Sequence, residues 1–267
     1  MASFSVVSNI SSLNAQANLV QTNLGLNRAL TRLSSGFRIN YSGDDAAGLA
    51  VANAYRNDIA IITQGIRNAN DGLSTLQIKD GALANISTLL DRLATLATQA
   101  ASGETSDASR ATLDLEFQDV LREIDREATV AGLTADHGFS VFVSNNGANG
   151  KITGTIAGTS VAALNLTGHE LTTQAAAEAA VAAVADAVKT LGVAQGTIGV
   201  LQNRLQFAIS LGQSQVVNNK AAESRIRDAN IAEETANMTR FNILSQSGIA
   251  ALAQANQSSS MVLSLLR

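Results

Sequence analysis

The chain has 267 residues and a formal net charge of −4, with no Pro, Cys or Trp and with seven Phe and two Tyr as its only aromatic residues. The absence of Pro favours long uninterrupted helices, because Pro costs about 3 kcal/mol in a helix interior. The absence of Cys excludes disulfides and cysteine-based nucleophiles or metal sites, and the acidic balance disfavours a general nucleic-acid binder. No stretch of about 18 consecutive apolar residues occurs, so the sequence predicts no membrane-spanning helix.

The amino-terminal segment over residues 5–34 has the periodicity of an amphipathic helix. Its apolar positions step by three and four residues, the spacing of a helix face that meets another helix in a coiled coil. They are Ile10, Leu13, Ala17, Val20 and Leu24. Residues 34–46 are rich in Ser, Gly and Asn and predict an irregular connector. Asp44 or Asp45 is expected to cap the helix that follows, since a carboxylate accepts from the free N–H groups of a first turn.

Two further helices are predicted in the first half of the chain. The first runs from residue 46 to near Ala101, and the same three-four stepping of Ile, Leu and Ala recurs along most of it. The second begins within residues 105–109, after Ser102 and Gly103, and continues to about residue 128. Its apolar stripe contains Leu113, Phe117, Val120, Ile124 and Ala128.

The segment from about 132 to 170 differs in composition and periodicity from the helical segments and predicts the only β-structure. Alternating apolar residues occur in short runs, and the loop at 145–150 reads NNGANG, which is rich in residues that accept a positive φ angle. We therefore predict a β-hairpin region at about 138–167. A further short strand at 161–166 is expected to extend it.

Helical periodicity returns at Leu171 and continues to the end of the chain. The apolar residues of this helix are predicted to lie on one stripe, formed by Val181, Val184, Val188, Leu191, Ile198, Leu205, Ile209 and Val216. The last helix has apolar or small residues at heptad spacing. They are Met238, Phe241, Gly248, Leu252, Ala255, Val262 and Leu266.

These patterns predict a mainly α fold, with long coiled-coil-like helices formed from both termini and one small β-hairpin region. Residues 1–45 and 229–267 are predicted to form an inner domain of terminal helices with connectors, and residues 46–228 an outer helical domain. An amphipathic helix cannot bury its apolar stripe alone, so the termini must pair with each other, with other copies, or with both. We hypothesise that they are disordered in the monomer and fold on self-association.

Two segments resemble the two ends of bacterial flagellin. Residues 26–50 read LNRALTRLSSGFRINYSGDDAAGLA, and residues 223–267 read ESRIRDANIAEETANMTRFNILSQSGIAALAQANQSSSMVLSLLR. The resemblance covers roughly residues 1–131 and 171–267. Only about 40 residues separate the two regions, so the chain resembles a short flagellin with inner and outer helical core domains and no added outer domains.

The resemblance implies a structural subunit that self-assembles into the flagellar filament for swimming motility, with no enzymatic activity and no cofactor. It implies a secreted protein of the extracellular flagellum, exported without a signal peptide, with no nucleic-acid or membrane partner. The implied partners are further copies of the chain, an export chaperone at the carboxy-terminal helix, and the hook-associated and cap proteins. The alternatives are a hook-filament junction protein and a secreted adhesin or enzyme with flagellin-like ends.

The assembly seam is assigned to apolar residues of both terminal helices. They are Ile10, Leu13, Val20, Leu24, Met238, Phe241, Leu252, Val262 and Leu266. By resemblance to flagellins that Toll-like receptor 5 detects, a receptor patch is assigned to Arg92, Leu96, Gln99 and Glu116, with Leu96 as its apolar centre. Receptor activation is expected to be weak, because Ala94 and Thr95 stand where detected relatives carry a basic and an acidic residue.

Three arginines near the connector have two interpretations. Arg28, Arg32 and Arg38 either form a solvated helix face or contact carboxylates, those of Asp44 and Asp45 or of a neighbouring subunit. We favour the second, because a segment without acids that packs among copies of itself needs partners for its charge.

The sequence predicts no catalytic or metal site. Its two histidines, His137 and His169, lie in the Gly-rich middle with Asp136 and Glu170 beside them in sequence. Neighbours in sequence point to opposite sides of a strand, which separates these pairs. We interpret both histidines as surface loop residues.

Overall fold

Five α-helices and one hairpin make up the part of the chain that the computed structural model describes, which is residues 8–265 without the side chains of 148 and 258–265. The helices are α1 (Ile10–Ser35), α2 (Ala46–Ala101), α3 (Asp107–Val130), α4 (Gln174–Arg227) and α5 (Ile231–Leu265). The hairpin consists of β1 (His137–Phe142) and β2 (Lys151–Ile156), joined through the short helix η1 (Gly147–Gly150). The predicted mainly α fold with one small hairpin is confirmed.

The chain forms two compact units, which are described separately below. The terminal unit contains the residues up to Asn57 and from Asn219 onward, and the outer unit contains Asp58–Asn218. The first turns of α2 and the last turns of α4 therefore belong to the terminal unit, whereas the sequence placed the division at residues 45/46 and 228/229.

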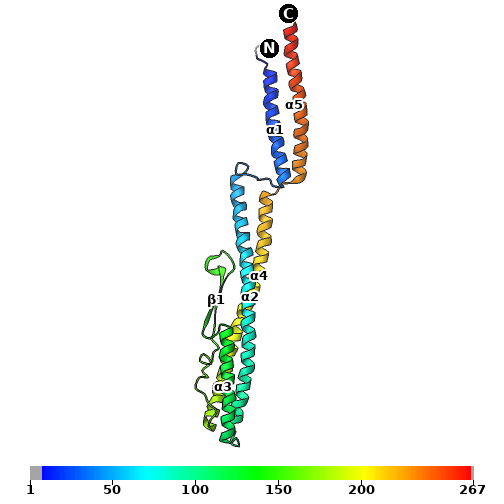
Figure 1. The fold of residues 1–267 in the computed structure, drawn as a ribbon. Helices are drawn as coiled ribbons and strands as arrows, with labels where there is room; N and C mark the ends of the chain where they lie inside the picture. Colours follow the sequence, from blue (N-terminus) through cyan, green and yellow to red (C-terminus); the bar gives the residue numbers. More distant parts are fainter. Residues whose placement is uncertain (1–7, 266–267) are drawn as a thin grey trace. The chain divides into compact units, whose positions relative to one another are not determined.

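Helices α1 and α5 lie side by side and antiparallel in the terminal unit (Figure 1). Asn9 caps α1 by accepting from the Ser12 N–H at 3.0 Å, and Gly36 ends the helix in the left-handed conformation at φ 75°. The connector after α1 pairs with the junction between α4 and α5 through two backbone hydrogen bonds, from Arg38 N–H to the Arg227 carbonyl (2.7 Å) and from Ala229 N–H to the Gly36 carbonyl (2.9 Å). These bonds hold the two interhelical segments together at the end of the helix pair that is remote from the chain termini.

The predicted long helix is confirmed with its cap. Asp45 accepts from the Gly48 N–H at 2.8 Å and caps α2, while Asp44 accepts from the backbone N–H groups of Asn40 and Tyr41 and shapes the connector. The neighbouring acids Asp44 and Asp45, either of which the sequence allowed as the cap, therefore have different roles. α2 ends at Ala101 as the sequence predicted.

The core of the outer unit lies between α2, α3, α4 and the hairpin. Its largest fully buried side chains include Leu76, Leu83, Leu90, Leu93, Phe117 and Ile124. The α4 face that enters this core combines small residues, Ala177, Ala180, Ala187 and Ala194, with the bulky residues Val184, Leu191, Ile198, Leu201 and Leu205. Within the predicted stripe, Val184, Leu191, Ile198 and Leu205 are buried, whereas Val188 is 41% exposed. The pattern of bulky residues did not detect the four alanines that share this buried face.

The hairpin packs on α2 and α4 at positions where a helix or strand has no side chain. A Cβ at Gly65 of α2 would lie 1.8 Å from the Val143 carbonyl oxygen, and one at Gly154 of β2 would lie 2.8 Å from the Leu201 side chain. Glycine is therefore required at both positions for the neighbouring atoms to approach this closely. Within the hairpin, the antiparallel register pairs His137 with Ile156 and Phe142 with Lys151.

The prediction of a strand at 161–166 was wrong. This segment folds into consecutive turns, in which Leu164 N–H donates to the Ser160 carbonyl (2.9 Å) and Leu166 N–H to the Val161 carbonyl (2.9 Å). Asp125 of α3 also accepts from the Val161 N–H at 2.8 Å. The backbone N–H groups of Leu164 and Leu166 are bonded within the turns, and that of Val161 is bonded to α3. They are therefore not free to pair with a strand, and the hairpin ends at Ile156.

Candidate assembly surface

The contact face between α1 and α5 includes glycines that lie against larger side chains of the partner helix. A Cβ on Gly25 would lie 2.6 Å from the Phe241 ring, and one on Gly248 would lie 3.1 Å from the Leu19 side chain. Ala29 is buried at this contact. Met238, Phe241 and Leu252 of the predicted seam are partly buried. The side chain of Val262, and Leu266 as a whole, lie outside the described residues.

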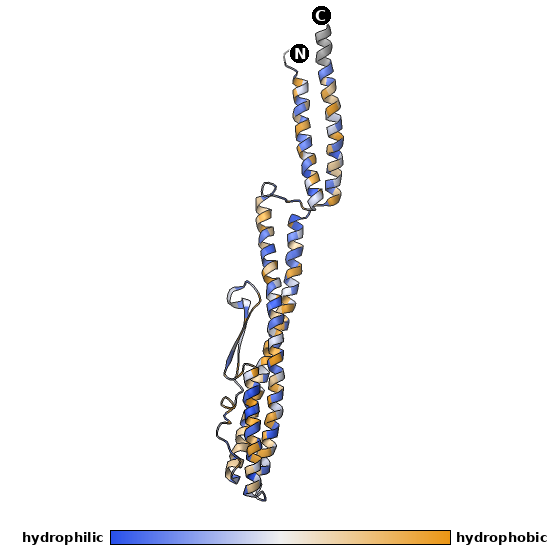
Figure 2. Ribbon diagram, viewed as in Figure 1, coloured by the Kyte–Doolittle hydropathy of each residue, from blue (hydrophilic) through white to orange (hydrophobic). Residues whose placement is uncertain are grey.

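The α1 residues of the predicted seam lie on the other side of the helix, away from α5. Their exposed fractions are high for aliphatic side chains, at 62% for Ile10, 60% for Leu13, 53% for Val20 and 49% for Leu24. We call these four residues the outward stripe. α5 likewise exposes Ile243, Leu244 and Ile249, and Figure 2 shows apolar residues recurring along both helices. α1 therefore has two apolar faces, and the pairing with α5 covers only one.

The arginines near the connector are engaged to different degrees. Arg32 forms an ion pair with Glu234 of α5 at 3.1 Å, and Glu234 is buried. Arg38 lies 3.8 Å from Asp45 and donates to the Ile226 carbonyl at 2.9 Å. The predicted contact with the acidic pair is thus confirmed for Arg38. Glu234 could not be assigned to Arg32 from sequence, because no local spacing links residues so far apart.

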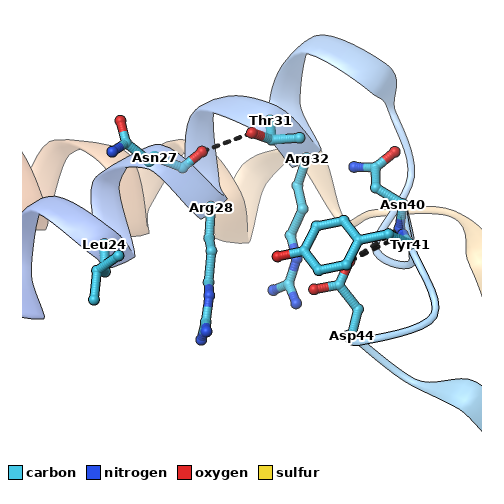
Figure 3. A pocket seen from close by; sticks show the side chains of 8 residues that line it. All are labelled: Leu24, Asn27, Arg28, Thr31, Arg32, Asn40, Tyr41 and Asp44. Carbon is cyan, nitrogen blue, oxygen red and sulfur yellow. Dashed lines mark hydrogen bonds between the residues drawn. The ribbon is translucent and has the colours of Figure 1, made fainter.

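Arg28 lines a cavity of about 220 Å³ between the last turns of α1 and the connector (Figure 3). Arg32, Tyr41 and Asp44 also line it. Sequence reasoning singled out both arginines and Asp44 but missed Tyr41. Its aromatic ring inside a polar connector was an available signal.

Two buried cations close helix ends in the outer unit, and sequence reasoning missed both. Lys79, which is 5% exposed, donates to the Ala131 carbonyl at 3.1 Å, at the negative end of the α3 dipole. Its burial lowers the pKa of the Lys79 ammonium. Arg110 donates to the carbonyls of Ala100 and Ser102, both at 2.9 Å, and so satisfies the carboxyl end of α2.

The receptor patch assigned by resemblance is only partly on the surface. Arg92 and Glu116 are exposed and bonded to each other, with Arg92 Nε donating to Glu116 Oε1 at 2.8 Å. Gln99 is exposed. Leu96 is 1% exposed within the core of the outer unit, so its assignment as the apolar centre of the patch was wrong. Leu96 lies on the same inward face of α2 as Leu93 and Ala97, and a receptor does not reach it in this fold.

No group of three or more His, Asp or Glu side chains that could hold a metal ion occurs among the described residues. In the same part of the chain, no helix is long and apolar enough to span a membrane. The surface features are instead exposed aliphatic stripes on paired terminal helices and an arginine-lined cavity. They define a protein of long paired helices whose terminal helices carry exposed apolar faces.

Comparison with known proteins identifies the family. The bacterial flagellin N-terminal helical region matches residues 6–133, and the bacterial flagellin C-terminal helical region matches residues 181–266. A flagellin of Halalkalibacterium halodurans is 35% identical over 97% of this chain and 98% of its own length. The flagellar filament 33 kDa core protein of Treponema phagedenis is 32% identical over 97% of this chain and 98% of its own length.

The chain belongs to the bacterial flagellin family and is a structural subunit of the flagellar filament. A solved structure of a putative flagellar hook-associated protein from Vibrio parahaemolyticus matches with a TM-score of 0.54 at 13% identity, covering 69% of this chain and 100% of that one. At that identity the likeness concerns the fold alone. Nothing in these comparisons favours the hook-filament junction alternative.

Proposed function

We propose that copies of this chain assemble by burying the outward stripe, in cooperation with the seam residues on α5. The observation that supports this most is the continuous exposure of Ile10, Leu13, Val20 and Leu24 on a helix whose other face already pairs with α5. Burying each such side chain stabilises an assembly by about 1.5–3 kcal/mol. A homopolymer repeats that gain at every subunit.

Substitution at the stripe tests this proposal. Leu13→Asp places a charge on the stripe, which costs several kcal/mol when it is buried without a partner. Asn14→Asp adds the same charge at the next residue, which is exposed and beside the stripe. We expect Leu13→Asp to abolish filaments in negative-stain images and Asn14→Asp to retain them. Normal filaments from Leu13→Asp would contradict the proposal.

The export route is a second part of the proposed function. The chain is secreted to the extracellular filament as an unfolded polypeptide through the flagellar channel, with an export chaperone on the carboxy-terminal helix. The exposed apolar residues of α5 support this, because a chaperone has an unpaired face to cover before assembly. In a strain without the flagellar export gate the chain is expected inside the cell, and its appearance in the medium would contradict this route.

The further partners follow from membership of a filament-forming family. Hook-associated and cap proteins are proposed to contact the terminal helices at the two ends of the filament. The chain acts without enzymatic activity or cofactor. Toll-like receptor 5 is proposed to bind weakly, through the exposed pair Arg92 and Glu116 and nearby Gln99, and without the buried Leu96.

A further inference from the structure

The cavity beside α1 contains one cationic group, the Arg28 guanidinium, whose charge no described residue of the chain matches. Arg32 is paired with Glu234 at 3.1 Å, and the Asp44 carboxylate accepts from the Asn40 N–H at 3.1 Å. Among the residues that the structure describes, the Arg28 guanidinium has no hydrogen-bond or ion-pair partner, and neither has the Tyr41 hydroxyl. Figure 3 shows the Arg28 side chain leaving α1 on the side of the Tyr41 ring, with the hydroxyl directed toward it. The cavity therefore offers two donors, both on exposed side chains, to which no described group of the chain is bonded.

These donors define the chemistry of the occupant. A guanidinium presents a planar fork of N–H groups that matches a carboxylate, and a phenol adds a further O–H donor. Asp44 also lines the cavity, and its negative charge repels a doubly charged anion more than a singly charged one. Leu24 adds an apolar wall that suits the methylene carbons of a side chain. An Asp or Glu side chain fits this combination.

The terminal unit has few unpaired Asp or Glu side chains that could occupy the cavity. It carries nine Lys and Arg residues against six Asp and Glu, and Arg32 and Arg38 already occupy Glu234 and Asp45. The outer unit carries nine Lys and Arg against sixteen Asp and Glu. Several of its acids are exposed and have no ion-pair partner among the described residues. They are Asp71, Asp80, Asp91 and Glu104.

We propose that the cavity receives an acidic side chain from the outer unit of a second copy, which Arg28 and the Tyr41 hydroxyl bind. Because the two units carry opposite net charge, each copy has a basic cavity in its terminal unit and acidic side chains on its outer unit that can enter the cavity of another copy. Complementary charge fixes the register between partners more than it adds affinity. The inference rests on the proposed function, since it needs copies that meet in a polymer.

The test compares charge reversals in the purified full-length chain. The critical concentration for assembly is measured by sedimentation for Arg28→Glu, for Arg28→Lys and for the matched control Arg56→Glu, which reverses an exposed arginine of the same unit outside the cavity. We expect Arg28→Glu to raise it at least about tenfold, Arg28→Lys to raise it only a few-fold, and Arg56→Glu to leave it unchanged. Equal far-UV circular dichroism of the monomers shows that the variants fold alike.

A second-site reversal identifies the donor. One of Asp71→Lys, Asp80→Lys, Asp91→Lys or Glu104→Lys is expected to restore assembly of Arg28→Glu. Normal assembly of Arg28→Glu, equal loss in Arg56→Glu, or rescue only by Glu233→Lys in the terminal unit would overturn the proposal. Wild-type assembly that requires added phosphate would also overturn it, in favour of a free anion. A wild-type chain that forms no filament at all would instead contradict the proposed function.

Discussion

Replacing Gly65 by Ala places a methyl group where the backbone of the hairpin lies. The new Cβ would be 1.8 Å from the Val143 carbonyl oxygen, whereas ordinary contacts begin at 3.4 Å. The neighbour is backbone, so no side-chain rotation relieves the overlap. The end of β1 would have to move away from α2 by about 1.5 Å.

The energetic result follows from what the hairpin buries there. Phe139 and Val143 are both buried in the outer core, and full exposure of either would cost about 1.5–3 kcal/mol. Partial separation of both costs about 3 kcal/mol, and the better helix propensity of Ala returns about 1 kcal/mol. The expected net loss of about 2 kcal/mol lowers the melting temperature of a unit of this size by about 4–8 °C.

Thermal unfolding of the full chain, followed by far-UV circular dichroism, measures this shift. Gly81→Ala is the matched control, because Gly81 lies on the same helix and a Cβ there meets nothing within 4 Å. It is expected to stabilise the helix by up to about 1 kcal/mol. If Gly65→Ala melts at or above the wild-type temperature, as Gly81→Ala should, the hairpin does not lie against Gly65 and the reasoning is refuted.

Three further predictions address the seam, a buried cation and the receptor patch. Leu252→Asp is expected to prevent filament formation while the outer unit keeps its melting transition, because a charge in the seam costs several kcal/mol. The control Asn146→Asp at the hairpin tip should assemble normally. Filaments of normal diameter from Leu252→Asp would show that the seam is misassigned. Burial lowers the pKa of Lys79, so in the alkaline range the unfolded chain binds more protons than the folded chain, and the free energy of unfolding should rise with pH there. Denaturant titrations at several pH values are expected to show this rise in the wild type and not in Lys79→Met. Parallel pH profiles of the two proteins would contradict the prediction. In a Toll-like receptor 5 reporter-cell assay, depolymerised protein is expected to signal weakly and Arg92→Ala more weakly still, and strong signalling that ignores Arg92 would mean that the patch was transferred wrongly.

Local signals predicted the helices and the hairpin well, because each depends on residues that are close in sequence. The heptad spacing on α5, the Asp45 cap of α2 and the NNGANG loop each act within a few residues. The failures have long-range causes. The turns at 161–166 depend on Asp125 of α3, and the ion pair of Arg32 depends on Glu234 of α5.

The candidate surface was predicted in composition but not in orientation. The sequence placed the apolar residues of α1 in one seam with those of α5. The actual contact sets Gly25 against Phe241 and Gly248 against Leu19, and the outward stripe lies elsewhere. Hydrophobic periodicity weights bulky residues, although small residues let two helix backbones approach. The burial of Leu96 was predictable, because Leu96 shares the inward face of α2 with Leu93 and Ala97.

The central claim is that the outward stripe of α1 is exposed in the monomer and buried between copies in the filament. Because the chain has no Cys, Val20→Cys provides a single thiol on the stripe, and Asn146→Cys provides a control at the hairpin tip. Maleimide labelling is measured on monomers and on pelleted filaments of each variant. We predict that the thiol at position 20 reacts rapidly in the monomer and at least about tenfold more slowly in the filament, while the control reacts alike in both. Equal labelling of the position 20 thiol in monomer and filament would contradict the account.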